Sequence, residues 1–519
     1  MKQKKNIRFL LPLILFLAFI LRIVWVNYGL PDFFEIDEGF ILMPFVHGEA
    51  PLNPYVYPQF IYLSVQAIIE IASFFNIQDY NVYLLIGRFL NNLYALIQVF
   101  MVFLIARRAY SKPVGYIAAF LLAVLPIHIS LSSALRPDMP MTLMVLVGIY
   151  YLLGLLEKEY LRLKDYLIFS LIFALALSIK YPAAAILIPF LYTHYLKRKG
   201  KEFFTKELFI VFIATAVLFV LFNPMHFIEF KRFFATMRYE ASLQSGSSPF
   251  AYKHSTWIKY LIILIGGFGE GLWLISILAI FRVLLNRGKE DVLILLFPLV
   301  YFGVMGYYRV ANARFILPVV PFMVIISADL IFSLFERFRH LKRGKLIILV
   351  SGFLLLSPTL YRSGKYVAWA VQKDTRFIAL EWVEENIPPG SSLLIDSAGS
   401  PINILLSNGD PRYSLFDMDW MQPPEKHITM IEEGRFDYFI LDRYQRSRYP
   451  EKAVRPVHEY IENNFEKIAE FRVKIGKPKI FHHIYYRRNN PHTLIFSAHK
   501  NEELKISFDQ ESAVRINSH

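Results

Sequence analysis

The chain has 519 residues, of which 55% are hydrophobic, 16% are aromatic and 19% are charged. Soluble domains carry about 25% charged residues, and apolar runs of about 20 residues, long enough to cross a bilayer, recur along this chain. These values exclude an ordinary soluble protein. We predict an α-helical polytopic membrane protein with a small C-terminal domain.

The net charge of +14 would suggest a nucleic-acid partner in a soluble chain, but its distribution argues against one. Residues 1–364 contain 35 Lys and Arg against 20 Asp and Glu, whereas residues 365–519 contain 21 against 22. The excess lies in the membrane part, where basic loop residues set orientation. Cysteine is absent, which excludes disulfides, thiolate catalysis and Cys-ligated zinc.

The apolar runs predict about eleven transmembrane helices within residues 1–364. They fall at residues 9–26, 83–106, 113–131, 139–156, 165–180, 181–196, 206–223, 257–282, 291–308, 314–335 and 345–362. The first run is too long for a signal peptide and contains Arg22, so we expect an uncleaved span. The pair that meets at Lys180 is either a tight hairpin or one broken helix.

Loop charges predict the orientation of these spans. The segments 1–8, 107–112, 157–165, 197–206, 282–289 and 336–345 together contain 23 Lys and Arg. The first outer loop, 29–82, contains none but holds seven acids. Because positive loops stay in the cytoplasm, we expect a cytoplasmic N-terminus in an inner-membrane protein. Within this loop, segment 57–76 is apolar but contains polar residues, which predicts a helix at the membrane interface.

Residues 365–519 are expected to form a soluble extracytoplasmic domain of the α/β or α+β class. An amphipathic helix is predicted over 377–387, and a second near 455–468. Strand-like runs occur at 393–395, 438–441 and 484–486.

The first outer loop concentrates acids close to the membrane. These are Asp32, Glu35, Asp37, Glu38 and Glu49, without a basic neighbour in sequence. Neighbouring carboxylates raise one another's pKa, which suits a general base or a metal site. The alternative is a solvated acidic loop that simply obeys the topology rule.

Basic residues predicted on the outer side are informative because topology selects against them there. Arg136 and Asp138 follow the third span, Lys180 lies at the short turn, and Arg309 and Arg314 flank the start of the tenth span. Together they would form a clamp for a lipid-linked phosphate. The alternative is that each cation extends to outer-leaflet headgroups, with Asp138 capping a helix.

Two other motifs carry less weight. The sequence GGFGEG at 266–271 lies inside an apolar span and follows no strand, so small residues for close helix packing explain it better than a phosphate loop. The pair His482–His483 lacks metal-ligand spacing, and a lone His47 or His128 proves little.

These residues resemble the GT-C membrane glycosyltransferases, in particular the protein O-mannosyltransferase and lipid A aminoarabinose transferase group. Four short motifs carry the resemblance in order along the chain. They are Asp37–Glu38, Arg136-x-Asp138, SIKYPA at 178–183 and ARFILPVVP at 313–321. The segment 374–391 also resembles the start of the outer domain in bacterial members, whereas the last 130 or so residues match no pattern we can name.

The resemblance implies a GT-C fold over 1–364 and inverting transfer of a sugar from a polyprenyl- or dolichyl-phosphate carrier. The acceptor, a protein or a glycolipid, would react on the outer face. Asp37 would be the base, with Glu38 as helper or alternative. Donor phosphate would bind to Arg136, Lys180, Arg309 and Arg314. Orienting roles would fall to Asp138, which would orient an arginine, and to His47, Tyr57 and Tyr181. Some members use a divalent metal at the loop acids, here Asp37 and Glu38, so metal dependence stays open.

Three other functions compete with this interpretation. A transporter or flippase is one, but such proteins tend to show related halves, and the 29–82 loop has no counterpart later in the chain. An O-antigen polymerase or ligase is another, in which the acceptor loop would lie later. The third is an assembly scaffold that binds no polyprenyl phosphate.

Overall fold

The computed structural model of the chain describes residues 9–30, 36–48, 55–198, 203–247, 252–286, 288–341, 343–396, 412–418, 422–442, 451–472 and 492–498. The chain separates into two compact units at residues 372 and 373. We refer to the described residues up to 372 as the helical unit, and to those from 373 onward as the C-terminal unit.

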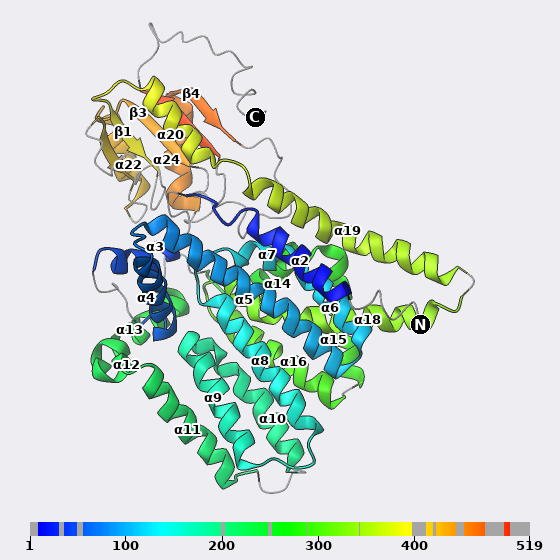
Figure 1. The fold of residues 1–519 in the computed structure, drawn as a ribbon. Helices are drawn as coiled ribbons and strands as arrows, with labels where there is room; N and C mark the ends of the chain where they lie inside the picture. Colours follow the sequence, from blue (N-terminus) through cyan, green and yellow to red (C-terminus); the bar gives the residue numbers. More distant parts are fainter. Residues whose placement is uncertain are drawn as a thin grey trace. The chain divides into compact units, whose positions relative to one another are not determined.

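The helical unit begins with the elements that build the first outer loop and the core of the bundle (Figure 1). In chain order these are α2 (Leu10–Ile23), α3 (Ile36–Val46), α4 (Gln59–Phe74), α5 (Tyr80–Ala109), α6 (Lys112–Ala123), α7 (Pro126–Ser132), α8 (Asp138–Glu157), α9 (Leu163–Ile179), η2 (Tyr181–Ile186) and α10 (Leu187–Lys197). The predicted interfacial helix over 57–76 corresponds to α4.

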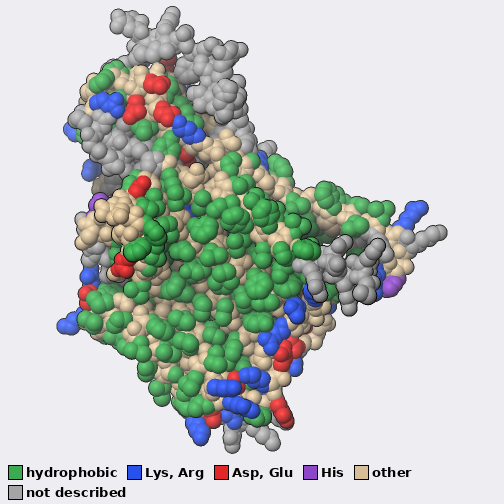
Figure 2. Space-filling view, in the orientation of Figure 1, with side chains coloured by type: hydrophobic (Ala, Val, Ile, Leu, Met, Phe, Trp, Pro, Cys, Tyr) green, Lys and Arg blue, Asp and Glu red, His purple; other side chains and the backbone are tan. Residues whose placement is uncertain are grey.

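The remainder of the helical unit continues this pattern. Its elements are α11 (Lys206–Phe222), α12 (Met225–Ile228), α13 (Phe230–Ser242), η3 (Leu243–Ser247), α14 (Trp257–Phe268), α15 (Glu270–Asn286), α16 (Lys289–Tyr307), α17 (Ala313–Ile316), η4 (Leu317–Val319), α18 (Val320–Phe338) and α19 (Gly344–Ala370). Hydrophobic side chains cover the middle of the face of this unit shown in Figure 2, and Lys and Arg side chains gather below them.

A helix or a broken helix lies at each predicted span. Among the described residues, four helices are long and apolar enough to cross a membrane: α5, α8, α16 and the run Ala313–Phe338. The pair α6 and α7, bent by 60°, would make a fifth. The other predicted spans correspond to helices that are shorter, broken or less apolar, so the count of eleven stays a prediction.

The span predicted over 257–282 is broken into α14 and α15 at Gly269. This residue has φ +82, a conformation that glycine adopts without strain. Packing also explains its neighbours, because a Cβ on Gly267 would lie 2.7 Å from the Cβ of Ile127. The GGFGEG motif therefore serves close helix packing, as predicted.

Loops predicted to share the cytoplasmic face meet at one end of the helical unit. Arg108, in the last turn of α5, pairs with Glu157 at the end of α8 at 2.5 Å. The hydroxyl of Tyr110 donates to Asp291, at the start of α16, at 2.7 Å. Residues far apart in sequence therefore gather as the alternation of loops predicts.

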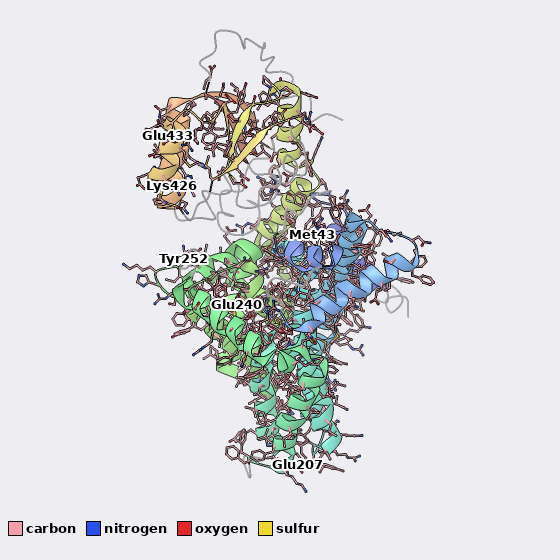
Figure 3. All side chains as sticks on the ribbon, turned by 90° about the vertical axis from the view of Figure 1, so that its left-hand side faces the viewer. Met43, Glu207, Glu240, Tyr252, Lys426 and Glu433 are labelled. Atoms are coloured by element: carbon pink, nitrogen blue, oxygen red, sulfur yellow. The ribbon has the colours of Figure 1, made fainter. Side chains whose placement is uncertain are left out.

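The elements of the first outer loop lie at the opposite end. Figure 3 shows Met43 of α3 and Glu240 of α13 toward one end of the helical unit, and Glu207 of α11 at the other. The turn at Lys180 is a hairpin rather than one broken helix, because the Tyr166 hydroxyl near the start of α9 lies 3.0 Å from Nδ1 of His194 near the end of α10.

The C-terminal unit contains a mixed five-stranded sheet with helices on both faces. Its elements are α20 (Thr375–Asn386), β1 (Ser392–Ile395), β2 (Ser414–Asp417), α22 (Pro424–Glu432), β3 (Tyr438–Asp442), α24 (Glu451–Asn464), β4 (Glu466–Phe471) and β5 (Thr493–Ser497). The strand order is β2-β1-β3-β5-β4; β1 is parallel to β2 and β3, and β5 is antiparallel to β3 and β4.

Alternation along the strands explains why helices cover both faces of this sheet. Leu393 and Ile395 point to the side where Ala379 and Val383 of α20 pack, whereas Leu394 points to the side of α22 and α24. The mixed sheet with helices on both faces confirms the predicted α/β or α+β class. The strand expected at 484–486 and the pair His482–His483 lie outside the described residues.

Candidate functional site

Asp37 stands in the first turn of α3, where the positive end of the helix favours a carboxylate. Its carboxylate oxygen Oδ2 lies 3.2 Å from Nε of Arg136 and also pairs with Nη1 of Arg314. The Asp37 side chain is 23% exposed, whereas Arg136 is almost completely buried at 3%. The structure therefore brings together three residues that are about 100 and 180 positions apart in sequence.

Glu38, the next residue, is fully buried and has a different environment. Both of its carboxylate oxygens accept hydrogen bonds from Arg88 of α5, at 3.0 Å from Nε and 2.7 Å from Nη2. The backbone N–H of Leu135 donates to the same carboxylate at 2.8 Å. This two-point pairing occupies Glu38 within the structure, so its geometry favours positioning rather than proton transfer.

Arg88 is a residue that sequence reasoning missed, although an arginine within an apolar span is itself a signal. Its third nitrogen, Nη1, donates to the Val26 and Tyr28 carbonyls at 3.1 and 2.6 Å. Arg88 therefore joins α3, α5 and the end of the first predicted span.

Arg136 reaches the site on the short segment between α7 and α8. Side chains of α5 hold this segment: the Asn91 amide donates to the Ala134 carbonyl, and the Ser133 hydroxyl donates to Asn92 at 3.1 Å. Together with the bond from Leu135 to Glu38, these contacts fix the backbone immediately before Arg136.

Lys180 and Asp138 join the same group of charges. The Lys180 ammonium pairs with Oδ1 of Asp138 at 2.6 Å and lies 5.2 Å from the ring centre of Phe315. The Arg314 guanidinium lies 5.1 Å from the same ring, so one aromatic side chain holds both cations. We refer to Asp37, Arg136, Asp138, Lys180 and Arg314 as the charged cluster. That Asp138 orients an arginine stays a prediction.

The structure does not place all the predicted site residues in the charged cluster. Arg309 is exposed. Its backbone N–H donates to the Gln244 carbonyl at 2.9 Å, and its guanidinium lies against Gly246. His47 is exposed at the end of α3. Tyr57 packs on the apolar group formed by α3, α4 and α5. Roles for these three residues stay predictions.

Tyr181 belongs to a second polar group, which sequence reasoning missed. Its hydroxyl donates to the Tyr55 carbonyl at 3.1 Å and lies 2.8 Å from Nε2 of His226. The Tyr55 hydroxyl donates to Glu229 at 2.6 Å. We refer to Tyr55, Tyr181, His226 and Glu229 as the tyrosine–histidine cluster; it joins the first outer loop to α12 and α13.

Burial controls protonation in the tyrosine–histidine cluster. It lowers the pKa of His226 to about 4, and Nδ1 of this ring is buried without a hydrogen-bond partner that could accept an added proton. Burial together with the hydrogen bond to Glu229 raises the pKa of Tyr55 to about 12. Both groups are therefore neutral near pH 7.

Comparison with known proteins places this arrangement in context. Residues 72–228 match the model of the dolichyl-phosphate-mannose-protein mannosyltransferase family. The chain is similar to the apo oligosaccharyltransferase of Archaeoglobus fulgidus, with a TM-score of 0.54 and 12% identity over 90% of this chain and 73% of that one. It is also similar to apo ArnT from Cupriavidus metallidurans, with a TM-score of 0.50 and 11% identity over 95% of this chain and 98% of that one. The chain has the fold of the GT-C membrane glycosyltransferases. A search of curated proteins finds no match.

The family match and the GT-C fold confirm the resemblance predicted from the motifs and show an integral membrane protein. The matched segment contains Arg88, Arg136, Lys180 and His226, whereas Asp37 and Arg314 lie outside it. Both residues nevertheless meet Arg136 in space, so the charged cluster combines matched and unmatched parts of the chain.

The described residues do not fit the divalent metal that some GT-C enzymes use. No group of three or more His, Asp or Glu side chains in this part of the chain is arranged to hold a metal ion. Arg88 and Leu135 occupy the carboxylate of Glu38, which leaves Asp37 without a second acidic ligand from Glu38. Asp32, Glu35 and Glu49 lie outside the described residues.

Proposed function

We propose that this GT-C protein transfers a sugar, hexose or pentose, from a polyprenyl- or dolichyl-phosphate carrier to an acceptor hydroxyl or phosphate, with inversion at the anomeric carbon. The charged cluster is the observation that carries this proposal. It is supported by the match to a family that uses dolichyl-phosphate mannose. A similar fold, at a TM-score of 0.52 and 11% identity, is that of the archaeal oligosaccharyltransferase AglB in complex with an inhibitory peptide and a dolichol-phosphate.

Charge balance supports phosphate binding at the charged cluster. The cluster contains three cations, Arg136, Lys180 and Arg314, against the two carboxylates of Asp37 and Asp138. One positive charge is therefore in excess, and a donor phosphate supplies an anion to match it. Guanidinium groups bind phosphate oxygens through two parallel hydrogen bonds, and such charge-assisted bonds are about twice as strong as neutral ones.

Phosphate binding would also free the base. In the structure the two arginines that would bind phosphate are paired with Asp37. When they turn to the donor phosphate, the Asp37 carboxylate is released to accept the proton of the acceptor. The acceptor oxygen then bonds to the anomeric carbon, the bond from that carbon to the phosphate oxygen breaks, and the phosphate leaves with the electron pair. The paired arginines stabilise this developing negative charge.

The loop charges support the placement of this reaction on the outer face of an inner membrane, with a cytoplasmic N-terminus and an extracytoplasmic C-terminal unit. In this orientation the charged cluster faces the compartment where lipid-linked sugars are consumed without nucleotide sugars. A protein or a glycolipid would serve as acceptor.

Purified protein in vesicles tests this function. The donors are undecaprenyl phosphates carrying radiolabelled mannose, glucose or aminoarabinose, and a total membrane extract supplies acceptors. Asp37→Asn is expected to abolish transfer while it preserves binding of undecaprenyl phosphate. Asp329→Asn is the matched control, because Asp329 pairs with Arg282 at 2.5 Å and is similarly buried, at 17% exposure.

Full transfer by Asp37→Asn would disprove the role of this residue as base. Movement of the labelled lipid across the vesicle bilayer without transfer would favour a flippase instead. Wild-type protein that binds no undecaprenyl phosphate would favour a scaffold.

A further inference from the structure

A buried arginine stabilises the break between α6 and α7. Arg22 of α2 has no exposed surface, and its guanidinium donates to the Leu122 and Ala123 carbonyls at 3.3 and 3.0 Å. In a continuous helix the Leu122 carbonyl would accept from the residue four positions later, but that residue is Pro126, which has no N–H. Arg22 supplies a donor to this carbonyl, beside the Leu125 N–H at 3.4 Å, where the chain bends by 60°.

The same guanidinium continues into a chain of buried side chains. Nη2 of Arg22 lies 2.7 Å from Nδ1 of His128. Because a guanidinium can only donate, Nδ1 must accept, and the His128 proton is therefore on Nε2. From there it is donated to the Gln98 side-chain oxygen at 3.0 Å, and the Gln98 amide donates to the Met139 carbonyl at 2.8 Å.

The chain of contacts ends on the segment that carries Arg136. Met139 lies in the first turn of α8, three residues after Arg136. The other end of this segment packs against the same residue, because the Ser133 hydroxyl, which donates to Asn92 at 3.1 Å, lies 3.4 Å from the Arg22 backbone carbonyl. One residue of α2 is therefore connected to both ends of the segment 133–139.

We propose that Arg22, His128 and Gln98 form a positioning relay for the charged cluster. They touch neither Asp37 nor a reacting group. They fix the course of residues 133–139, and Arg136 is thereby held against Asp37. A span that needed only stability would avoid a buried arginine, because a cation within the membrane is costly. The significance of the relay for catalysis rests on the function proposed above, whereas its effect on the backbone does not.

Amide hydrogen exchange of purified protein in detergent tests the relay without a donor. Gln98→Met keeps the side-chain length but removes both hydrogen bonds. We expect exchange in the peptide 133–139 to accelerate about tenfold, because one of the two lost bonds, the bond to the Met139 carbonyl, holds this peptide directly. Ser327→Ala is the control, because it removes a buried hydroxyl bond of 2.8 Å to Ser276 between α18 and α15.

A second variant guards against misfolding of the first. Arg22→Lys keeps the positive charge but cannot reach the two carbonyls and His128 at once, so it should also accelerate exchange in 133–139. Unchanged exchange in this peptide, with folded Gln98→Met or Arg22→Lys, would overturn the proposal.

Binding of undecaprenyl phosphate is measured on the same samples. It separates the proposed relay from the proposed function in sugar transfer. Weakened binding by about tenfold in Gln98→Met, together with faster exchange, supports the relay as a positioning device for phosphate binding. Faster exchange with a wild-type protein that binds no undecaprenyl phosphate supports the relay and contradicts the proposed function. Faster exchange with unaltered binding in Gln98→Met would overturn its role at the charged cluster.

Discussion

Replacing Glu38 by Gln separates a structural carboxylate from a catalytic one. Glu38 and Arg88 are fully or almost fully buried and are joined by two hydrogen bonds of 3.0 and 2.7 Å. Glu38→Gln removes the negative charge and leaves the Arg88 guanidinium buried. Breaking a buried pair in this way costs about 3–5 kcal/mol. The free energy of unfolding should fall by an amount near this range.

The control for this prediction is Glu157→Gln. Glu157 also makes two hydrogen bonds to an arginine, Arg108, at 2.6 and 2.5 Å, but its side chain is 58% exposed. Surface pairs contribute about 0–1 kcal/mol, so this variant should unfold almost like the wild type. Thermal and denaturant unfolding of the purified protein in one detergent compares the two.

A double variant sharpens the test. Glu38→Gln combined with Arg88→Met removes both charges and should recover part of the lost stability, because no uncompensated cation remains. If Glu38→Gln unfolds like Glu157→Gln and still loses sugar transfer, then Glu38 acts chemically and our structural interpretation is wrong.

Three further predictions concern the charged cluster and its surroundings. Arg314→Gln should weaken binding of undecaprenyl phosphate about tenfold or more, since a charge-assisted hydrogen bond contributes about 1.5–3 kcal/mol. Arg339→Gln is the control and should leave binding unchanged, because Arg339 belongs to an exposed ion pair with Glu336. Acidification from pH 6.5 to 4 should destabilise the protein by up to about 3 kcal/mol through His226. Folding lowers the pKa of this histidine, so the unfolded chain binds the proton first as the pH falls. His226→Phe should reduce the loss of stability at low pH. A chelator should leave binding of undecaprenyl phosphate unchanged, since Asp37 pairs with Arg136 and Arg314 and Glu38 pairs with Arg88.

Each of these predictions has a contradicting outcome. Equal binding by Arg314→Gln and Arg339→Gln would remove Arg314 from the phosphate site. An identical pH profile of unfolding in wild type and His226→Phe would show that another group carries the acid sensitivity. Binding that disappears with chelator and returns with Mg²⁺ would place a metal in the site.

Periodicity and loop charge predicted much of the helical unit because both act locally. Every predicted span has a helix or a broken helix, and loops predicted to share a face meet, as Arg108 and Glu157 do. The break at Gly269 was missed because a glycine within an apolar run is compatible with a continuous helix. The structure shows why glycine is needed there: φ is +82, and the backbone nitrogen and side-chain oxygen of Thr359 lie 2.9 Å from the position of a Cβ.

The charged cluster was predicted in part, and its omissions have a common cause. Asp37, Arg136 and Arg314 break the topology rule or stand in a short motif, which sequence reveals. The partner of Glu38 depends on the rotation of α5, which decides whether Arg88 faces lipid or protein. The tyrosine–histidine cluster depends on a contact between Tyr55 and Glu229, 174 residues apart, for which a single sequence holds no signal.

The contacts of Glu38 bear on how such proteins can be recombined. One carboxylate holds the helix that carries Asp37 and, through Leu135, the segment that carries Arg136. A chimera that received α3 alone from a relative would therefore gain the acid pair. Its own α5 would need an arginine at the position that corresponds to Arg88 to hold this pair. The unit that can be exchanged is α3, α5 and the α7–α8 segment together, and changes in any one of them should be accompanied by changes in the others.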